Sequence, residues 1–136
     1  MRQVDDSKHC TVTFTISASG NILKPMVVYQ GTPRGRIALR ELPLHPHGCH
    51  YAMQKKAWFD EAVMLDWVEN VLAPYVATAP AGVIPIIFLD SFKVHLLGSV
   101  AYAIESLGVE VEFIPAGCAA WFSPSTSALT SHTSRT

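Results

Sequence analysis

The residues best suited to chemistry are an aspartate and a histidine that follow a short apolar run. The run covers residues 84–89 and ends in Asp90, and His95 comes five residues later. A β-branched and aromatic run without polar alternation predicts a strand buried on both faces, as in a parallel sheet. Ligands of such sheets bind beyond the carboxyl ends of the strands, where Asp90 lies. Asp90 is therefore a candidate functional residue, and the alternative is that it caps the following helix.

A second group of reactive side chains lies between residues 45 and 50. It consists of His45, His47, Cys49 and His50. Imidazole and thiolate are the usual zinc ligands, but no second ligand pair follows at the spacing of a zinc site. Cys118 is the one further thiol in the second half of the chain, and nothing in the sequence places it nearby. We expect a histidine-rich loop without metal, with a small zinc-binding protein as the alternative.

The elements that position Asp90 follow from hydrophobic periodicity. Residues 11–17 alternate apolar and hydroxyl side chains, and residues 22–29 form a second β-prone run, which together predict an antiparallel hairpin. A helix is predicted from Asp60 to Pro74, with one apolar face that serves as scaffold. Residues 84–114 predict a strand, a helix and a second strand, which is a βαβ unit with parallel strands.

The segment between the hairpin and the scaffold helix is the longest loop that the sequence predicts. Residues 31–49 contain three prolines and three glycines, and Arg34, Arg36 and Arg40 make the segment locally basic. Long loops are often functional, so contact with a phosphate backbone is one interpretation. A solvated loop with ordinary surface arginines is the other.

Five blocks of sequence occur together in a recognisable order. They are residues 12–31, residues 32–37, residues 54–61, Asp90 with His95, and residues 114–118. In these blocks the chain resembles the DDE superfamily nuclease domain of pogo-like and jerky-like transposases. The resemblance implies an α/β, ribonuclease-H-like fold with a mixed sheet that combines the antiparallel hairpin and the βαβ unit. It also implies that the chain lacks the first strand and the last helix of that fold.

The resemblance also implies a chemistry. In the family, three carboxylates hold two Mg²⁺ or Mn²⁺ ions, which cut DNA and transfer its strands. Asp90 matches the second of these acids, so it is the implied metal ligand, and Asp90 and His95 are the implied catalytic residues. His95 is expected to hydrogen-bond a carboxylate or a phosphate, or else to cap or pack the loop. Lys93 is either a phosphate contact or a solvated side chain, and the implied location is the nucleus.

The other two family acids have no counterpart in the pattern. Asp5 and Asp6 fall where the family has a turn, and Thr126 stands where the third acid is expected. A neutral hydroxyl does not balance two divalent cations. We therefore expect a partial and inactive transposase-derived nuclease domain, and the alternative is a non-catalytic module that binds nucleic acid or a protein partner.

The expected domain organisation is one domain over residues 1–122 and a tail over residues 123–136. The tail holds five serines, four threonines and no acidic residue, so we expect it to be disordered. The implied sheet order is 3-2-1-4-5, and the absent first strand leaves a gap between the hairpin and the βαβ unit. Unpaired backbone groups are costly, so we expect residues 1–9 to fill the gap or the fragment to be marginally stable.

Composition sets the outer limits. The formal net charge is −1 and the pI is about 6.6, so contact with nucleic acid depends on local basic patches. No apolar run approaches the roughly 20 residues that a membrane span needs, and no signal segment is visible, so we expect no membrane association. Three cysteines, an odd number at wide spacing, argue against a disulfide framework.

Overall fold

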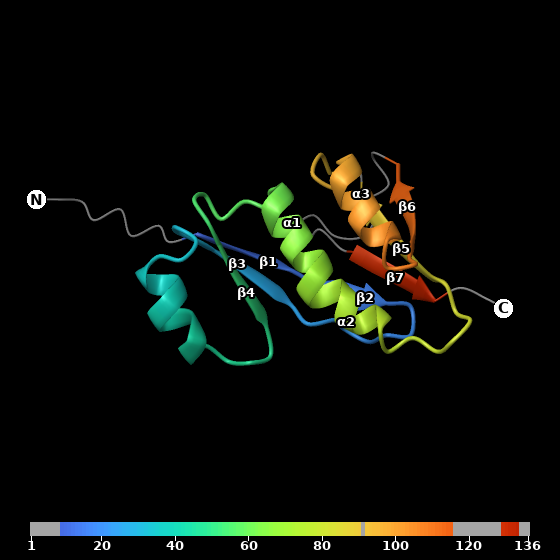
Figure 1. Cartoon of the computed structure of the whole chain (residues 1–136), viewed down its shortest axis with the longest axis horizontal. Coiled ribbons are helices and arrows are strands. Elements are labelled where there is room, and N and C mark those ends of the chain that lie inside the picture. The colour runs from blue at the N-terminus through green and yellow to red at the C-terminus, as the bar shows by residue number, and fades with distance from the viewer. Residues whose placement is uncertain (1–8, 91, 116–128, 134–136) are drawn as a thin grey trace, which may run out of the picture.

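The computed structural model describes residues 9–90, 92–115 and 129–133 and shows short strands with helices packed along one side (Figure 1). The strands are β1 (Cys10–Thr13), β2 (Thr15–Ser17), β3 (Met26–Gln30), β4 (His50–Gln54), β5 (Pro85–Asp90), β6 (Glu110–Ile114) and β7 (Leu129–Thr133). The helical elements are η1 (Ile37–Glu41), η2 (Leu42–Leu44), α1 (Glu61–Trp67), η3 (Val68–Leu72), α2 (Ala73–Val76) and α3 (Gly98–Glu105). The chain is thus a mixed α/β protein, as the sequence predicts.

The strands form two sheets, and the first segment of the hairpin contributes to both. One sheet has the order β1-β3-β4 and the other the order β2-β7-β5-β6. The predicted strand over residues 11–17 divides at Phe14, so that β1 pairs with β3 and β2 enters the second sheet. The pairing of β1 with β3 is antiparallel, which confirms the predicted hairpin. Gly20 supplies the positive φ of 87° that its turn requires.

The segment between the hairpin and the scaffold helix is more ordered than the predicted loop. A π-helical turn, η1, and a 3-10 turn, η2, occupy residues 37–44, and β4 then pairs in parallel with β3. The sequence of β4, His-Tyr-Ala-Met-Gln, lacks clean alternation of apolar and polar residues, so periodicity does not reveal the strand. The parallel pairing is possible because η1 and η2 carry the chain back to the start of β3.

The predicted scaffold helix is present and runs beyond Pro74. Asp60 caps its start, because the carboxylate accepts a hydrogen bond from the Val63 N–H at 2.9 Å. The π-helical element η3 ends at Leu72, and Pro74 is the second residue of α2, where a missing N–H is tolerated because it lies in the first turn of a new helical segment. The helix therefore continues through α2 to Val76 instead of ending at the proline.

The core joins this helix to both sheets. Trp67, Met64 and Leu72 are almost completely buried, as are Met26 from β3 and Ile87 from β5. The further buried members of the cluster are Leu23, Val28, Val63, Val68, Val71, Leu89, Val94, Val100, Ile104 and Val109. One apolar face of the helix thus packs against strands of each sheet, as its periodicity predicts.

The βαβ unit is confirmed. β5 and β6 are parallel, Asp90 pairs with Ile114 at the end of the ladder, and α3 connects the strands. Ile87 and Leu89 are fully buried, whereas their neighbours Ile86 and Phe88 are only partly buried. The strand is therefore fully covered on one face only, and the expectation of burial on both faces is wrong in this respect.

The predicted tail contains an ordered strand. β7 lies between β2 and β5, parallel to the former and antiparallel to the latter. The expectation of a wholly disordered tail is therefore wrong for Leu129–Thr133, and residues 123–128 and 134–136 lie outside the described residues. Among the described residues, β7 occupies the gap between the hairpin and the βαβ unit, and of residues 1–9, which were expected there, only His9 is described. The physical reason is that two open strand edges offer backbone hydrogen bonds to any segment, whatever its side chains.

Candidate functional site

The structure brings the two predicted site residues into contact. Asp90 is the last residue of β5, and His95 lies in the turn before α3. His95 Nδ1 lies 2.7 Å from Asp90 Oδ1 and 3.3 Å from the Asp90 carbonyl oxygen. The Phe92 N–H donates to the same Oδ1 at 3.2 Å. α3 begins after Leu97 without a side-chain cap, so Asp90 does not cap this helix.

The hydrogen bonds determine which nitrogen of His95 carries a proton. Both oxygen neighbours of Nδ1 are acceptors when the Asp90 carboxyl is ionised, so Nδ1 is the protonated nitrogen that donates. The His95 residue is 3% exposed, and the Phe92 ring meets it edge to face at a centroid distance of 5.6 Å. His95 therefore holds the Asp90 carboxylate in one orientation at the carboxyl end of β5.

A cavity of about 520 Å³ lies beside this pair. Its lining comes from three separate segments: β1, the turn that leads into α1, and the loop that follows β5. The residues that matter for its chemistry are Thr11, Trp58, Phe59, Asp60, Phe92 and His95. The cavity therefore lies between the hairpin sheet and the βαβ unit, and His95 belongs both to its wall and to the Asp90 contact.

Asp60 is the one carboxylate among these lining residues, and both of its oxygens are engaged. Oδ1 accepts from the Val63 N–H, and Oδ2 accepts from Gln54 Nε2 at 3.1 Å. Gln54 in turn accepts from the backbone N–H groups of Lys56 and Trp58 at 2.7 and 3.0 Å. This network fixes the turn that presents Trp58 and Phe59 to the cavity. The sequence indicates Asp60 as a helix start, but it contains no signal that Asp60 lies near His95.

The two-metal site that the resemblance implies needs several carboxylates close together. Among residues 9–90, 92–115 and 129–133 there is no group of three or more histidine, cysteine, aspartate or glutamate side chains placed to hold a metal ion. Asp5, Asp6 and Thr126 lie outside the described residues. The strand beside β5, β7, has the sequence Leu-Thr-Ser-His-Thr and adds no carboxylate. The described residues therefore do not fit a pair of Mg²⁺ or Mn²⁺ ions.

The residues of the histidine-rich segment have separate partners. His45 packs edge to face against Tyr29 and Tyr51 at centroid distances of 5.5 and 5.2 Å. His50 Nε2 instead lies 3.1 Å from Asp66 Oδ1 on the scaffold helix. The ring of His45 and the imidazole of His50 thus help attach η2 and β4 to their neighbours. Cys10 and Cys49 are free thiols, and Cys118 lies outside the described residues.

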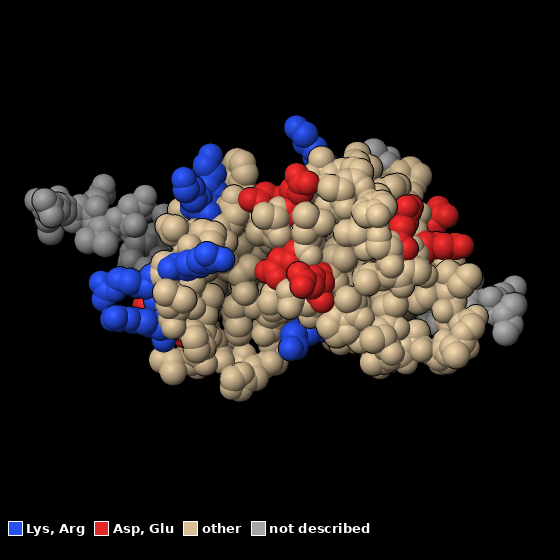
Figure 2. All heavy atoms as spheres, in the orientation of Figure 1, with Lys and Arg blue, Asp and Glu red and all other residues tan. Residues whose placement is uncertain are grey.

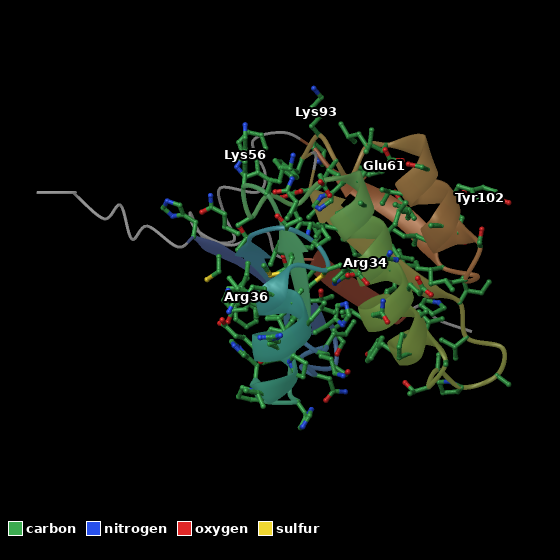
Figure 3. The ribbon with its side chains drawn as sticks, turned by 60° about the vertical axis from the view of Figure 1, so that its left-hand side comes forward. Arg34, Arg36, Lys56, Glu61, Lys93 and Tyr102 are labelled. Carbon is green, nitrogen blue, oxygen red and sulfur yellow. The ribbon has the colours of Figure 1, made fainter. Side chains whose placement is uncertain are left out.

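The charged side chains are unevenly distributed. Figure 2 shows basic side chains gathered at the end of the molecule where η1 and the tip of β4 lie, and acidic side chains over α1 and around β6. Arg34 and Arg36 lie at this basic end, and Figure 3 shows Lys56 and Lys93 both pointing away from one end of the ribbon. The chain therefore has a local basic surface although its formal net charge is −1. In the described part of the chain, no helix is long and apolar enough to cross a membrane.

Comparison with known proteins identifies the family. The description of the matching family is "DDE superfamily endonuclease", and the match covers residues 7–133. The human protein "Pogo transposable element with KRAB domain" is 27% identical over 109 residues, and its mouse counterpart is 26% identical over the same length. These matches cover 79% of this chain but only 16% of each relative, so the chain spans about a sixth of their length. No solved structure matches. The family match extends over nearly the whole chain, and the chain therefore belongs to the DDE superfamily endonucleases.

Proposed function

We propose that this chain is a transposase-derived nuclease domain of the ribonuclease-H-like kind, that it engages DNA, and that its own residues do not cleave DNA. The observation that carries the proposal is the environment of Asp90 at the carboxyl end of β5. The His95 contact at 2.7 Å holds its carboxylate in one orientation, as a ligand position requires. The resemblance in sequence supports the assignment of Asp90 to the second family acid. Asp90 is thus the metal-binding and catalytic position of the ancestral site, with His95 as its positioning partner.

The proposal of inactivity rests on the neighbours of Asp90 in the sheet. On one side, Asp90 pairs with Ile114 of β6, and on the other side the described pairing of β5 with β7 ends at Phe88 and Thr130. The sequence of β7 contains no acidic residue. A two-ion site stabilises both the attacking and the leaving oxygen, and it needs several carboxylates to balance four positive charges. A single carboxylate does not supply this balance, so phosphodiester cleavage by this mechanism is not expected from the chain.

The proposal of DNA contact rests on the basic end of the molecule. Arg34 and Arg36 precede η1, and Arg40 lies in its last turn. Lys55 and Lys56 follow β4 at the same end, whereas the acidic side chains gather elsewhere (Figure 2). Clustered arginine and lysine side chains attract the phosphate backbone, and the attraction weakens with salt. A DNA partner also favours a nuclear location for the protein.

A plasmid assay tests the absence of cleavage. Purified chain is incubated with supercoiled plasmid and Mg²⁺ or Mn²⁺, and we expect the plasmid to stay supercoiled. Asp90→Asn serves as the matched control because it keeps the size of the side chain and removes its charge. Nicking by the unaltered chain that disappears in Asp90→Asn would overturn the proposal, since it would show that further acids complete the site.

A salt titration tests the DNA contact. Binding of a short labelled duplex is measured over a range of salt concentrations for the unaltered chain and for Arg36→Gln. We expect Arg36→Gln to reduce the magnitude of the slope of log K against log salt by about 0.9, which corresponds to the loss of one phosphate contact. Lys24→Gln, at an exposed position beyond β2, is the control and should leave the slope unchanged. Equal slopes for all three proteins would contradict a phosphate contact at η1.

A further inference from the structure

We propose that the cavity beside His95 receives one unpaired nucleobase of single-stranded DNA, with the adjoining phosphates held by Lys56 and Lys93 at its rim. The choice of single-stranded DNA over single-stranded RNA rests on the function proposed above. The site is built from residues far apart in the sequence, since Thr11, Trp58 and Phe92 come from three different segments. None of them takes part in the metal chemistry of the family resemblance.

The first observation is the exposure of two large aromatic rings. Trp58 is 63% exposed and Phe92 is 50% exposed, yet both line one cavity. Trp67, by contrast, is completely buried in the core. An exposed indole and an exposed phenyl ring gain little for folding, whereas aromatic rings at a cavity are the usual stacking platform for unpaired bases.

The second observation is the position of the cations. Lys56 Nζ lies 4.6 Å from the centre of the Trp58 ring, so a cation–π contact holds an ammonium group beside the cavity. Lys93 lies in the turn that also carries Phe92 and His95. Figure 3 shows both lysine side chains pointing away from the same end of the ribbon. Aromatic rings with lysines beside them match the repeating pattern of base and phosphate along a single strand.

The third observation is the polarity of the cavity lining, which favours a neutral base over a phosphate as the occupant. Asp60 lines the cavity and caps α1 through its carboxylate, and a carboxylate repels a phosphate or another anion placed beside it. A neutral base avoids this repulsion, and its phosphates remain outside with the lysines. The volume of about 520 Å³ lies in the range of small-molecule sites and is sufficient for one base.

A duplex does not satisfy the same geometry. In a duplex the faces of each base are stacked on neighbouring pairs, so an aromatic ring in a protein cavity has no free base face to contact. Single-stranded DNA presents unstacked bases without that cost. The cavity therefore predicts a preference for single strands, which simple attraction to the phosphate backbone does not.

The experiment measures the anisotropy of a labelled single strand of about 12 nucleotides, a length within the site sizes of such proteins. EDTA is present, so that cleavage plays no part. We expect the single strand to bind more tightly than its duplex, and we expect Trp58→Ala to weaken single-strand binding about tenfold or more. Trp58→Phe keeps a stacking ring and should restore most of the affinity. Phe92→Ala should also weaken binding of the single strand while leaving binding of the duplex unchanged.

Tyr102→Ala is the matched control. Tyr102 is an aromatic residue that is 74% exposed, lies on α3 and points away from the two lysines in Figure 3. Its replacement should leave the affinity unchanged. The thermal midpoint of each variant verifies folding. Replacement of an exposed side chain such as that of Trp58 should leave the midpoint nearly unaltered.

Three results would overturn the proposal. They are equal binding of single strand and duplex, equal affinity of Trp58→Ala and Tyr102→Ala, and tighter binding of an RNA of the same sequence. Failure of the proposed function is distinguishable from each of these, because it shows as nicking of plasmid in the presence of metal or as a chain that binds no duplex in the salt titration. A chain that leaves plasmid intact and binds the duplex with the expected dependence on salt, but does not prefer the single strand, refutes the nucleobase site alone.

Discussion

Strand β7 supplies the sharpest test of the architecture, through the substitution Ser131→Pro. Ser131 is a central residue of β7 and pairs with Ser17 of β2 on one side and with Ile87 of β5 on the other. Ser17 is 3% exposed and Ile87 is completely buried. Proline has no N–H, so the substitution removes one ladder hydrogen bond in the middle of an interior strand, a position where proline is disfavoured.

The magnitude follows from the burial of the partners. Loss of one backbone hydrogen bond costs about 1 kcal/mol net, and the acceptor left unsatisfied in a buried strand costs about 1–3 kcal/mol more. We therefore expect the free energy of unfolding to fall by about 2–4 kcal/mol. For a domain of this size, each 1 kcal/mol corresponds to roughly 4 °C, so the thermal midpoint should fall by about 8–16 °C.

Thermal unfolding followed by circular dichroism measures this effect, with Ser131→Ala as the matched control. Alanine removes the same hydroxyl as proline but keeps the backbone N–H, so Ser131→Ala should stay within about 2 °C of the unaltered chain. A midpoint for Ser131→Pro that equals that of Ser131→Ala would refute the docking of β7. It would instead support a tail that contributes nothing to the fold.

Two further substitutions test local parts of the structure. Asp60→Ala should lower the free energy of unfolding in urea by about 1–2 kcal/mol, because the Val63 N–H loses its cap, whereas Asp60→Asn keeps an acceptor and should cost less. Equal losses for the two variants would contradict the capping role. Thr15→Val should raise stability by about 1 kcal/mol, because Thr15 Oγ1 is buried without a hydrogen-bond partner among the described residues. Thr11→Val is its control and should lower stability by about 1 kcal/mol, since Thr11 Oγ1 donates to the Ala57 carbonyl at 2.7 Å. A loss of stability in Thr15→Val would show that this hydroxyl has a partner.

Elements with a strong local pattern were predictable. The βαβ unit follows from an apolar run, a helical periodicity and an alternating strand, all of which are properties of neighbouring residues. The start of the scaffold helix follows from Asp60, because capping involves residues only three positions apart. The candidate pair Asp90 and His95 was found for the same reason, since the two residues are separated by a single turn.

Elements that depend on distant partners were not predictable in this way. β4 has no clean alternation, and its pairing with β3 exists only after η1 and η2 have turned the chain back. The polar side chains of β7 predict a disordered tail, yet β7 pairs through its backbone with two strands that are more than 40 residues away in sequence. Hydrogen-bonding backbone groups are the same in every residue except proline, so composition does not reveal where they find partners.

The sequence by itself determined the family, the α/β class and the one acidic residue at the end of a strand, because these depend on residue types and on short spacings. The tertiary structure alone decided which side chains surround that residue. It placed Trp58 and Phe92 on one cavity with His95, and it placed β7, which carries no carboxylate, beside β5. The physical reason is that a cavity and a sheet order arise from packing between segments, whose separation in space has no fixed relation to their separation along the chain.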